Sequence, residues 1–600
     1  MSRKMLSKEE PLCPKEWEIK CLTSLEDLWN KIPQAPKIPP KREEMQDRAI
    51  KSLVLFLVPF LVYVVPLPFA PLMEPDEARY GAIPSAMNAT GDYVTPRLKG
   101  VVYFEKPPLS YWATAFFYRV FGENEFSSRL FSALCAWGCI LLVYRMGLFF
   151  HDAKTGLYGA AALSTFLYHA AIGRINILDM PLAFLVSSAI WFGFLYFSSA
   201  KKRRMNLYLL YLLSALAFLA KGLIGIVFPF GVLVIWLAVS GRVREIPRMI
   251  SPAGLVIFSA VSLPWVILIQ RENPDFFRFF FIQEHFLRYA TRIHHHFEPF
   301  YYYLPFVLLG TLPWCAFLPE AFRVIRKVKN DLFGSVEKRF LLTWLGMILL
   351  FFSLSSSKLA SYIAPLFPPI ALFFGHLFRR YEEETEGFGN EKADSPLYGM
   401  AVVLPALLWI ALLLAPLFPH KYALAWNDWW PWIAFPLLAL LLTLFLPDLV
   451  RKRTGQGRLL TFYLLFALFL ASVALPAAKY MASYKSALPL SRAIQDHVPA
   501  GETVYQYGIS LYGIDFYTGM RTPIVDDIGE LGYGAERLLP EERARYFLTS
   551  DAFFRLIRGK GDLYCATKGG DKLERLKKEV PGLQVLWHNN AYQLVRLTRS

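Results

Sequence analysis

The amino-acid sequence predicts a polytopic α-helical membrane protein with a soluble α/β domain at its C-terminal end. Of its 600 residues, 55% are hydrophobic and only 19% are charged, against about 25% in soluble domains. The apolar residues form long runs, and about 20 consecutive apolar residues cross a bilayer as a helix. From about residue 479 onward the sequence is instead mixed and charged, as in a water-soluble domain.

The same composition excludes several classes of protein. An ordinary water-soluble enzyme and an intrinsically disordered chain both contain far less apolar sequence. The net charge of +16 is a feature of nucleic-acid binders, but most of the Lys and Arg residues stand between the apolar runs, and this placement excludes such a function. The six cysteines give no disulfide framework.

Residues 1–51 are interpreted as a cytoplasmic tail. They are mixed in charge and contain the proline-rich sequence PQAPKIPP at 33–40. The first apolar run begins only near Leu53, so no cleavable signal peptide is visible.

Residues 52–478 predict thirteen membrane spans. They lie near 53–72, 128–150, 155–173, 180–199, 206–221, 223–240, 253–270, 302–320, 340–356, 361–378, 398–418, 431–447 and 459–476. Basic residues are concentrated in alternate loops, for example KKRR at 201–204 and RKR at 451–453. The positive-inside rule then places the N-terminus in the cytoplasm, and an odd number of spans places the C-terminus outside.

Residues 479–600 predict an α/β domain on the outer side of the membrane. The segments TVYQY at 503–507 and QVLWHNNAYQLVRL at 584–597 have the pattern of strands, and 540–558 predicts a helix. About 120 residues are enough for a small core. The domain has a single cysteine, Cys565, and therefore uses no disulfide within itself.

The acidic residues of the outer loops point to a functional site. The first outer loop, residues 73–127, contains EPDEARY at 74–80 and YFEKPPL at 103–109. Acids and bases alternate there with aromatic residues and prolines, whereas an isolated loop acid is usually solvated surface. Asp179 lies at the outer junction of two spans, where an unpaired acid is costly. A helix cap, or an ion pair with Arg174, is the alternative explanation for Asp179.

Basic residues on the outer side are candidates for one anion-binding site. They are Arg79, Lys106, Arg288 and Lys358. Basic side chains at a membrane interface suit a lipid phosphate, and neighbouring acids suit a sugar or an acceptor hydroxyl. A Lys358 that only extends to the interface is the alternative. The chain has no P-loop and no Rossmann glycine motif, which favours a lipid-linked donor over a nucleotide.

Six motifs, taken in order along the chain, resemble one family of membrane glycosyltransferases. They are MEPDEARYGAI at 73–83, GDYVTPRLKG at 91–100, YFEKPPLSYW at 103–112, RINILDMPL at 174–182, EPFYYYLPFVLLGTLPW at 298–314 and SSSKLASYIAPLFPPIAL at 355–372. The sequence resembles the ArnT-like aminoarabinose transferases, the glycosyltransferase 83 family of the GT-C fold. The resemblance covers about residues 50–480 and extends to the span count and to an outer C-terminal domain.

The resemblance implies transfer of a sugar from undecaprenyl phosphate on the periplasmic face of a bacterial inner membrane. In that family the sugar is 4-amino-4-deoxy-L-arabinose and the acceptor is a phosphate of lipid A, whose modification lowers the attraction for cationic peptides such as polymyxin. By motif, the implied site comprises catalytic Asp76 and Asp179, donor-binding Arg79, Tyr103, Lys106, Arg288, Lys358 and Tyr362, and a metal pair of Glu105 and His285. No cofactor is required by the sequence, and a divalent metal such as zinc stays open.

Several alternatives stay open at this stage. Aminoarabinose is the favoured sugar, with galactosamine, galacturonic acid or a neutral hexose as alternatives, and the acceptor can instead be another surface glycolipid. A flippase for polyprenyl lipids is the alternative from another class, although no inverted repeat is visible. The two aspartates act either as a general base, which a hydroxyl acceptor needs, or as groups that hold the sugar, since a phosphate acceptor is mostly dianionic at neutral pH.

Overall fold

The computed structural model describes residues 48–199, 202–287, 298–318, 335–386, 462–471, 481–482, 484–559 and 562–598, with isolated positions between them. Residues Leu53–Ser600 form one compact unit. The predicted tail 1–51 and the predicted spans 398–418 and 431–447 lie almost wholly outside the described residues.

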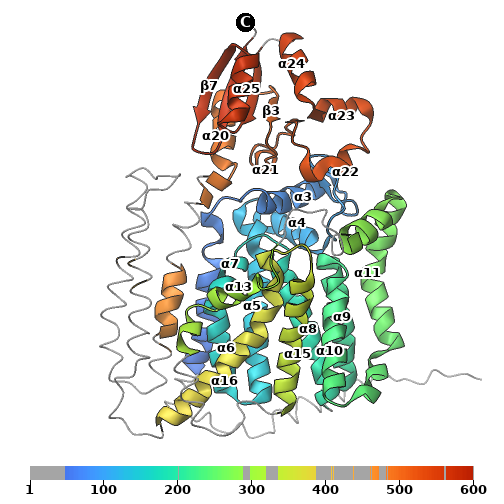
Figure 1. Cartoon of the computed structure of the whole chain (residues 1–600), viewed down its shortest axis with the longest axis vertical. Helices are drawn as coiled ribbons and strands as arrows, with labels where there is room; N and C mark the ends of the chain where they lie inside the picture. Colours follow the sequence, from blue (N-terminus) through green and yellow to red (C-terminus); the bar gives the residue numbers. More distant parts are fainter. Residues whose placement is uncertain are drawn as a thin grey trace, which may run out of the picture. The chain divides into compact units, whose positions relative to one another are not determined.

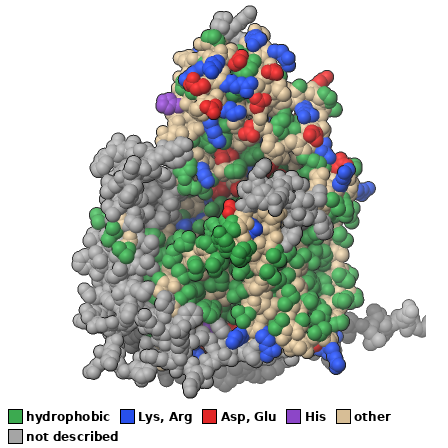
Figure 2. Space-filling view, viewed as in Figure 1, with side chains coloured by type: hydrophobic (Ala, Val, Ile, Leu, Met, Phe, Trp, Pro, Cys, Tyr) green, Lys and Arg blue, Asp and Glu red, His purple; other side chains and the backbone are tan. Residues whose placement is uncertain are grey.

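Long apolar helices form a bundle. They are α5 (Glu125–Phe150), α6 (Ala153–Thr165), α8 (Asp179–Ser198), α9 (Arg203–Lys221), α10 (Ile224–Val239), α11 (Pro252–Glu272), α15 (Ser335–Leu354) and α16 (Phe367–Glu386). Five helices in the described part of the chain are long and apolar enough to cross a membrane: Arg48–Phe69, Glu125–Phe150, Asp179–Ser198, Pro252–Glu272 and Ala360–Glu383. Figure 2 shows the apolar side chains gathered over this bundle. The count of thirteen spans stays a prediction.

Local sequence explains where these helices begin and how closely they pack. The Asn124 side chain accepts the Ser127 N–H in a capping box at the start of α5. Gly222, at a φ of 87°, ends α9 and allows the turn into α10. A Cβ atom added to Gly147 of α5 would lie 2.4 Å from the Cα atom of Gly156 in α6. Small residues therefore set the close approach of α5 and α6.

The predicted first outer loop, residues 73–127, is largely helical. It contains α3 (Asp76–Thr90), a hairpin of β1 (Arg97–Leu98) and β2 (Val101–Val102), and α4 (Leu109–Phe121). Lys99 and Gly100 form the hairpin turn with φ angles of 51° and 79°. Helix α3 packs against α4 and α21, and α4 packs against α5 and α9, so this segment connects the bundle to the C-terminal region (Figure 1).

A buried ion pair fixes α3 to the bundle. The Arg129 guanidinium of α5 donates from Nε and Nη2 to the two carboxylate oxygens of Glu77, each at 2.7 Å. The remaining donors of Arg129 bond to the carbonyls of Leu67, Ala70 and Pro71. Glu77 also accepts the backbone N–H of Asn176 at 2.9 Å. One carboxylate therefore joins α3, α5 and the segment that leads into α8.

The C-terminal region, residues 484–598, has the α/β character that the sequence predicts. Its six-stranded sheet has the order β5-β4-β3-β6-β8-β7. Strands β5, β4, β3 and β6 are parallel to one another, and β8 pairs antiparallel with both β6 and β7. The strands are β3 (Val504–Tyr507), β4 (Ile524–Val525), β5 (Phe547–Leu548), β6 (Leu563–Thr567), β7 (Gly582–His588) and β8 (Gln593–Thr598). The helices are α20 (Leu488–His497), α21 (Gly513–Thr518), α22 (Gly532–Ala535), α23 (Pro540–Tyr546), α24 (Ser550–Gly559) and α25 (Asp571–Glu579).

Two element predictions in this region are wrong in detail. The predicted helix 540–558 is interrupted, because Phe547 and Leu548 leave the helix to pair with β4 at the sheet edge. The predicted strand 584–597 is a hairpin, β7 and β8. The Asn589 side chain accepts the N–H groups of Ala591 and Tyr592 and so forms the turn.

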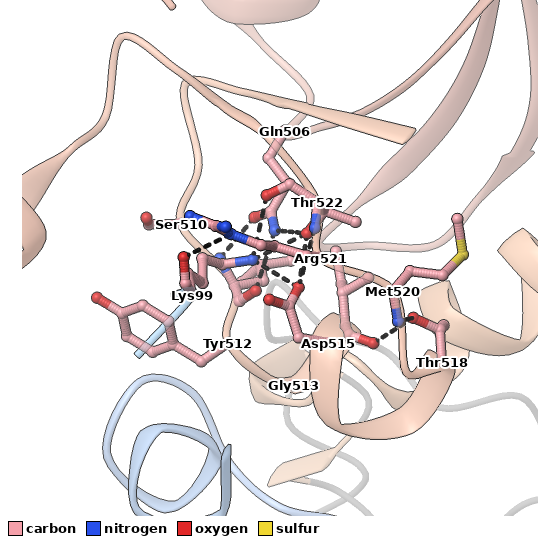
Figure 3. A network of polar contacts seen from close by, with 12 residues as sticks. Lys99, Gln506, Ser510, Tyr512, Gly513, Asp515, Thr518, Met520, Arg521 and Thr522 are labelled. Carbon is pink, nitrogen blue, oxygen red and sulfur yellow. Dashed lines mark hydrogen bonds and ion pairs between the residues drawn. The ribbon is translucent and has the colours of Figure 1, made fainter. Parts of the chain in front are cut away.

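Polar contacts dock the C-terminal region onto the first outer segment. The Glu74 carboxylate accepts the backbone N–H groups of Tyr512 at 3.1 Å and of Gly513 at 2.6 Å, at the start of α21. Lys99 donates to Asp515 at 2.6 Å and to the Thr522 hydroxyl at 2.8 Å (Figure 3). Burial raises the pKa of Glu74 to about 7, so the charge of this docking group changes near neutral pH.

We expect the loss of one partner of the Glu77–Arg129 pair to destabilise the protein strongly. A Glu77→Gln substitution leaves a buried guanidinium without its counter-ion and should destabilise the protein by about 3–5 kcal/mol. Thermal unfolding of the purified protein in detergent measures this loss. The control is Glu574→Gln, which removes an exposed ion pair with Lys577 and should change the melting temperature little. Equal stability of the two variants would contradict the role given to the buried pair.

We expect Glu74 to make stability depend on pH. In the unfolded chain the pKa of a glutamate is near 4.3, whereas the pKa of Glu74 in the native state is about 7. Between these two pH values the native state therefore binds more protons than the unfolded state. The contribution of Glu74 to stability is therefore complete below about pH 4 and is lost as the pH rises through 7. The melting temperature of the wild type minus that of Glu74→Gln should fall between pH 5 and 8 and then level off. A difference that rises or stays constant over this range would contradict the assignment.

Candidate active site

Asp76 and Arg79 form one side of the candidate site. Both lie in the first turn of α3, and the Arg79 Nη2 atom pairs with the Asp76 carboxylate. The Arg79 Nη1 atom pairs with Glu530 of the C-terminal region. The side chain of Arg79 is only 6% exposed, whereas those of Asp76 and Glu530 are 57% and 48% exposed. A buried cation thus holds two accessible carboxylates.

Tyrosine rings surround the Arg79 guanidinium. Its central carbon lies 5.1 Å from the ring centre of Tyr80 and 5.8 Å from that of Tyr103. The hydroxyl groups of Tyr103 and Tyr111 and the Nε atom of Arg79 are buried without a hydrogen-bond partner among the described residues. Such unsatisfied groups are costly in a folded protein. Their concentration here is a feature of a site that binds a polar ligand.

Three of the predicted acids influence the pKa of Tyr80. Burial raises its pKa, and the charges of Asp76, Glu105 and Asp179 raise the pKa further. These three carboxylates come from α3, the segment after β2 and the start of α8. Both predicted catalytic aspartates and Glu105 therefore lie within electrostatic range of one phenol, that of Tyr80. Figure 2 shows acidic and basic side chains in a hollow between the bundle and the C-terminal region.

Asp179 and Lys221 form the other side of the site. Asp179 is the first residue of α8, and its carboxylate pairs with the ammonium group of Lys221, the last residue of α9. The Lys221 Nζ atom lies 4.4 Å from the ring centre of Tyr362. Tyr362 therefore lies beside the Asp179–Lys221 pair, and its donor-binding role stays a prediction.

The structure supports neither of the two alternative explanations for Asp179. The N-cap position of α8 is Leu178, and Asp179 makes no capping hydrogen bond. Arg174 donates instead to the carbonyls of Ala170 and Leu470. The partner, Lys221, is not among the site residues predicted from the sequence. It is a lysine at the end of an apolar span, directly before Gly222, and this position alone does not indicate its partner.

The two predicted lysines of the site, Lys106 and Lys358, differ in their contacts. The Lys106 Nζ atom lies 3.8 Å from the Glu105 carboxylate and 3.0 Å from the Glu105 carbonyl. Lys358 is 6% exposed, and its ammonium donates to the carbonyls of Glu298 at 2.9 Å and Ser355 at 2.7 Å. No carboxylate pairs with Lys358 in the described part of the chain. A buried ammonium without a counter-ion is well suited to an anionic ligand.

Two predicted residues cannot be placed at the site. Arg288 lies outside the described residues, and of His285 only the backbone is described, in η5 (Arg278–Leu287). The described neighbours of Glu105 include Lys106 and Arg79, which do not bind metals. No group of three or more His, Cys, Asp or Glu side chains suitable for a metal occurs among the residues that could be searched. The metal pair of Glu105 and His285 stays a prediction.

The chain is similar to a group of bacterial transferases. It is 30% identical over 396 residues to an undecaprenyl phosphate-alpha-4-amino-4-deoxy-L-arabinose arabinosyl transferase from Photorhabdus laumondii, with 65% of this chain and 70% of that protein covered. It is 33% identical over 370 residues to the protein of the same name from Erwinia tasmaniensis, with 61% and 65% covered. The chain belongs to this family. The match to the Erwinia protein spans less than two thirds of that protein's length.

Two further comparisons agree with this family. Residues 105–267 match the family described as dolichyl-phosphate-mannose-protein mannosyltransferase. The crystal structure of ArnT from Cupriavidus metallidurans bound to undecaprenyl phosphate is 25% identical, with a TM-score of 0.75 over 91% of this chain and 97% of that chain. The fold is therefore the GT-C fold of this arabinosyl transferase family, in a multi-pass membrane protein.

We expect the Asp179–Lys221 pair to behave as one unit. Lys221→Met leaves a mostly buried carboxylate without its counter-ion and should cost about 3 kcal/mol of stability. Adding Asp179→Asn removes that charge and should restore a large part of the loss. Thermal unfolding of both single variants and the double variant measures the coupling. Additive losses would show that the two side chains do not depend on each other.

Proposed function

We propose that this protein is a lipid-linked-donor glycosyltransferase. It moves a sugar, 4-amino-4-deoxy-L-arabinose, from undecaprenyl phosphate to a phosphate of lipid A on the periplasmic face of the inner membrane. One observation carries the proposal: the carboxylates of Asp76 and Asp179 are each paired with a buried or mostly buried cation, Arg79 and Lys221, and both lie within electrostatic range of Tyr80. The names of the relatives support the sugar, and the ArnT structure bound to undecaprenyl phosphate supports the donor lipid.

The basic residues of the site would stabilise the donor phosphate as it leaves the sugar. When the bond between the sugar and the phosphate breaks, negative charge develops on the phosphate oxygens, and fixed cations stabilise that charge. Lys358 suits this role because its buried ammonium contacts only carbonyls in the described chain. We assign Lys106 and Arg288 to the same phosphate, with Tyr103 and Tyr362 lining the site.

The ion pairs explain how two aspartates can operate beside an anionic acceptor. An acceptor phosphate is mostly dianionic at neutral pH and needs no base to act as a nucleophile. Unpaired carboxylates would repel it. Lys221 neutralises Asp179, and Arg79, which is shared with Glu530, offsets part of the charge at Asp76; both pairings lower this repulsion. We therefore assign the aspartates to the sugar, where they hold its polar groups and stabilise positive charge at the reacting carbon.

The reaction assigned here needs no metal-dependent step. Among the described side chains, Glu105 is the only member of the predicted metal pair, and it lies beside Lys106 at 3.8 Å. A divalent ion bound there would add positive charge near the donor phosphate, and Glu105 and His285 would hold it. No part of the transfer is assigned to such an ion.

The domain bounds and the membrane orientation are those predicted from the sequence. We propose a cytoplasmic tail over residues 1–51, a catalytic membrane domain over 52–478 and a periplasmic α/β domain over 479–600. Thirteen spans place the N-terminus in the cytoplasm and the C-terminus in the periplasm. A positively charged sugar on lipid A weakens the attraction for polymyxin and related cationic peptides, so the activity contributes to antibiotic resistance.

The alternatives differ in the sugar, the acceptor or the class of protein. A related transferase could carry galactosamine, galacturonic acid or a hexose to another surface glycolipid with the same arrangement of charges. A flippase would move the lipid without breaking the sugar–phosphate bond. The comparisons favour transfer, because the relatives are named as arabinosyl transferases.

Mass spectrometry of lipid A tests the proposal. Cells that make the donor lipid and express the wild-type protein should contain lipid A with the added mass of aminoarabinose. Cells with Asp76→Asn or Asp179→Asn should lose at least 90% of it, since charge stabilisation by one such group is worth about 10²–10³ in rate. Glu574→Gln is the matched control and should retain full modification. Unmodified lipid A in wild-type cells that contain the donor would rule out this sugar and acceptor.

A further inference from the structure

The C-terminal region supplies a residue to the candidate site. Glu530 lies in the short helix η11 (Gly529–Leu531), and its carboxylate pairs with Arg79. The next residue, Leu531, is fully buried in a cluster that also contains Tyr80 and Tyr103. The position of Glu530 is therefore fixed by the same core that holds the tyrosines of the site.

The residues after Glu530 are packed tightly against the first outer segment. A Cβ atom added to Gly534 of α22 would lie 2.4 Å from the carbonyl oxygen of Val102 in β2. The ring of Tyr533 lies 4.0 Å from that of Phe279 and 5.8 Å from that of Phe104, centre to centre. Residues 529–535, which we name the site-facing segment, are thus built into the site and do not merely lie over it.

Among the described side chains, the charges that pair at Arg79 do not balance. Its single positive charge faces two carboxylates, Asp76 and Glu530, so these three side chains together carry one net negative charge. The Asp179–Lys221 and Glu105–Lys106 pairs nearby are each neutral as pairs. Both carboxylates at Arg79 are about half exposed and keep oxygen lone pairs for a ligand, because a carboxylate accepts several hydrogen bonds. This part of the site is therefore suited to a positively charged group.

We propose that Glu530 determines specificity by binding a protonated amine on the transferred sugar. This inference rests on the proposed function and narrows it to amino sugars. An ammonium group would complete the charge balance at Arg79 and form a charge-assisted hydrogen bond with the Glu530 carboxylate. Lys358 and Lys106, which carry the opposite charge, take the phosphate end of the donor. The C-terminal region thus contributes to recognition of the sugar in addition to its docking contacts.

Kinetics with two donors test the proposal on the full-length protein. The donors are undecaprenyl phosphate-linked 4-amino-4-deoxy-L-arabinose and the same lipid with its amine acetylated, which is neutral. Glu530→Gln should lower kcat/KM for the amine donor by about tenfold or more, as for loss of a hydrogen bond to a charged group, and should change transfer of the neutral donor less than twofold. Glu530→Asp should retain part of the preference. The control Arg537→Gln removes another ion pair of this region, with Asp275 at 2.9 Å, and should leave the preference unchanged.

Inhibition by undecaprenyl phosphate, which has no sugar, separates this role from two others. The inhibition constant should be the same for the wild type and Glu530→Gln, because the phosphate contacts are intact. A tighter inhibition constant in the variant would show that Glu530 competes with phosphate for Arg79 and would overturn the proposal. Equal loss with both donors would show a docking role and would also overturn it. A wild type that transfers neither donor would instead refute the proposed function itself, and a wild type that prefers the neutral donor would refute only the role of Glu530.

Discussion

The Glu77–Arg129 pair is the contact on which the geometry of the site depends. Glu77 lies next to Asp76 in α3, and its carboxylate also accepts the N–H of Asn176, three residues before Asp179. One buried carboxylate thereby fixes the distance between two segments that each carry a catalytic candidate. A buried ion pair contributes little net stability compared with apolar packing. The pair instead fixes positions. The five N–H donors of Arg129 are all bonded only when α3, α5 and the turn at 67–71 have one arrangement.

Three acids within four residues have three separate tasks. Glu74 accepts the N–H groups at the start of α21 and docks the C-terminal region. Asp76 is exposed at the site, and Glu77 is buried against Arg129. Docking of the C-terminal region, a place at the candidate site and the packing of α3 are thus combined in one turn of the chain. A small movement of this turn would affect all three, which couples the position of the C-terminal region to that of Asp76.

The sequence predicted the parts of the structure that depend on local pattern. Apolar runs located the helices of the bundle, and the motifs selected Asp76 and Asp179 as candidates for the site. What it could not supply were contacts between distant residues. Nothing near Lys221 indicates that it pairs with Asp179, 42 positions away, and Glu530 lies in an unremarkable acidic stretch. The helix predicted over 540–558 failed for the same reason, because pairing with β4 overrides the local helical preference of Phe547 and Leu548.

The pairing of each carboxylate with a cation has a consequence for the chemistry. In the proposed reaction, a site that joins an anionic donor to an anionic acceptor must hold two phosphates near one sugar without excessive repulsion. Free lysines and arginines alone would bind both phosphates tightly and favour the ground state as much as the transition state. Paired charges attract phosphate less strongly and keep the aspartates available for the sugar. The ammonium of Lys358, with carbonyl partners only, then remains a strong attractor at one end of the site. Under the proposed function, catalysis would follow from this asymmetry: Lys358 would stabilise the charge that develops on the leaving phosphate, and the paired carboxylates would stabilise positive charge on the sugar.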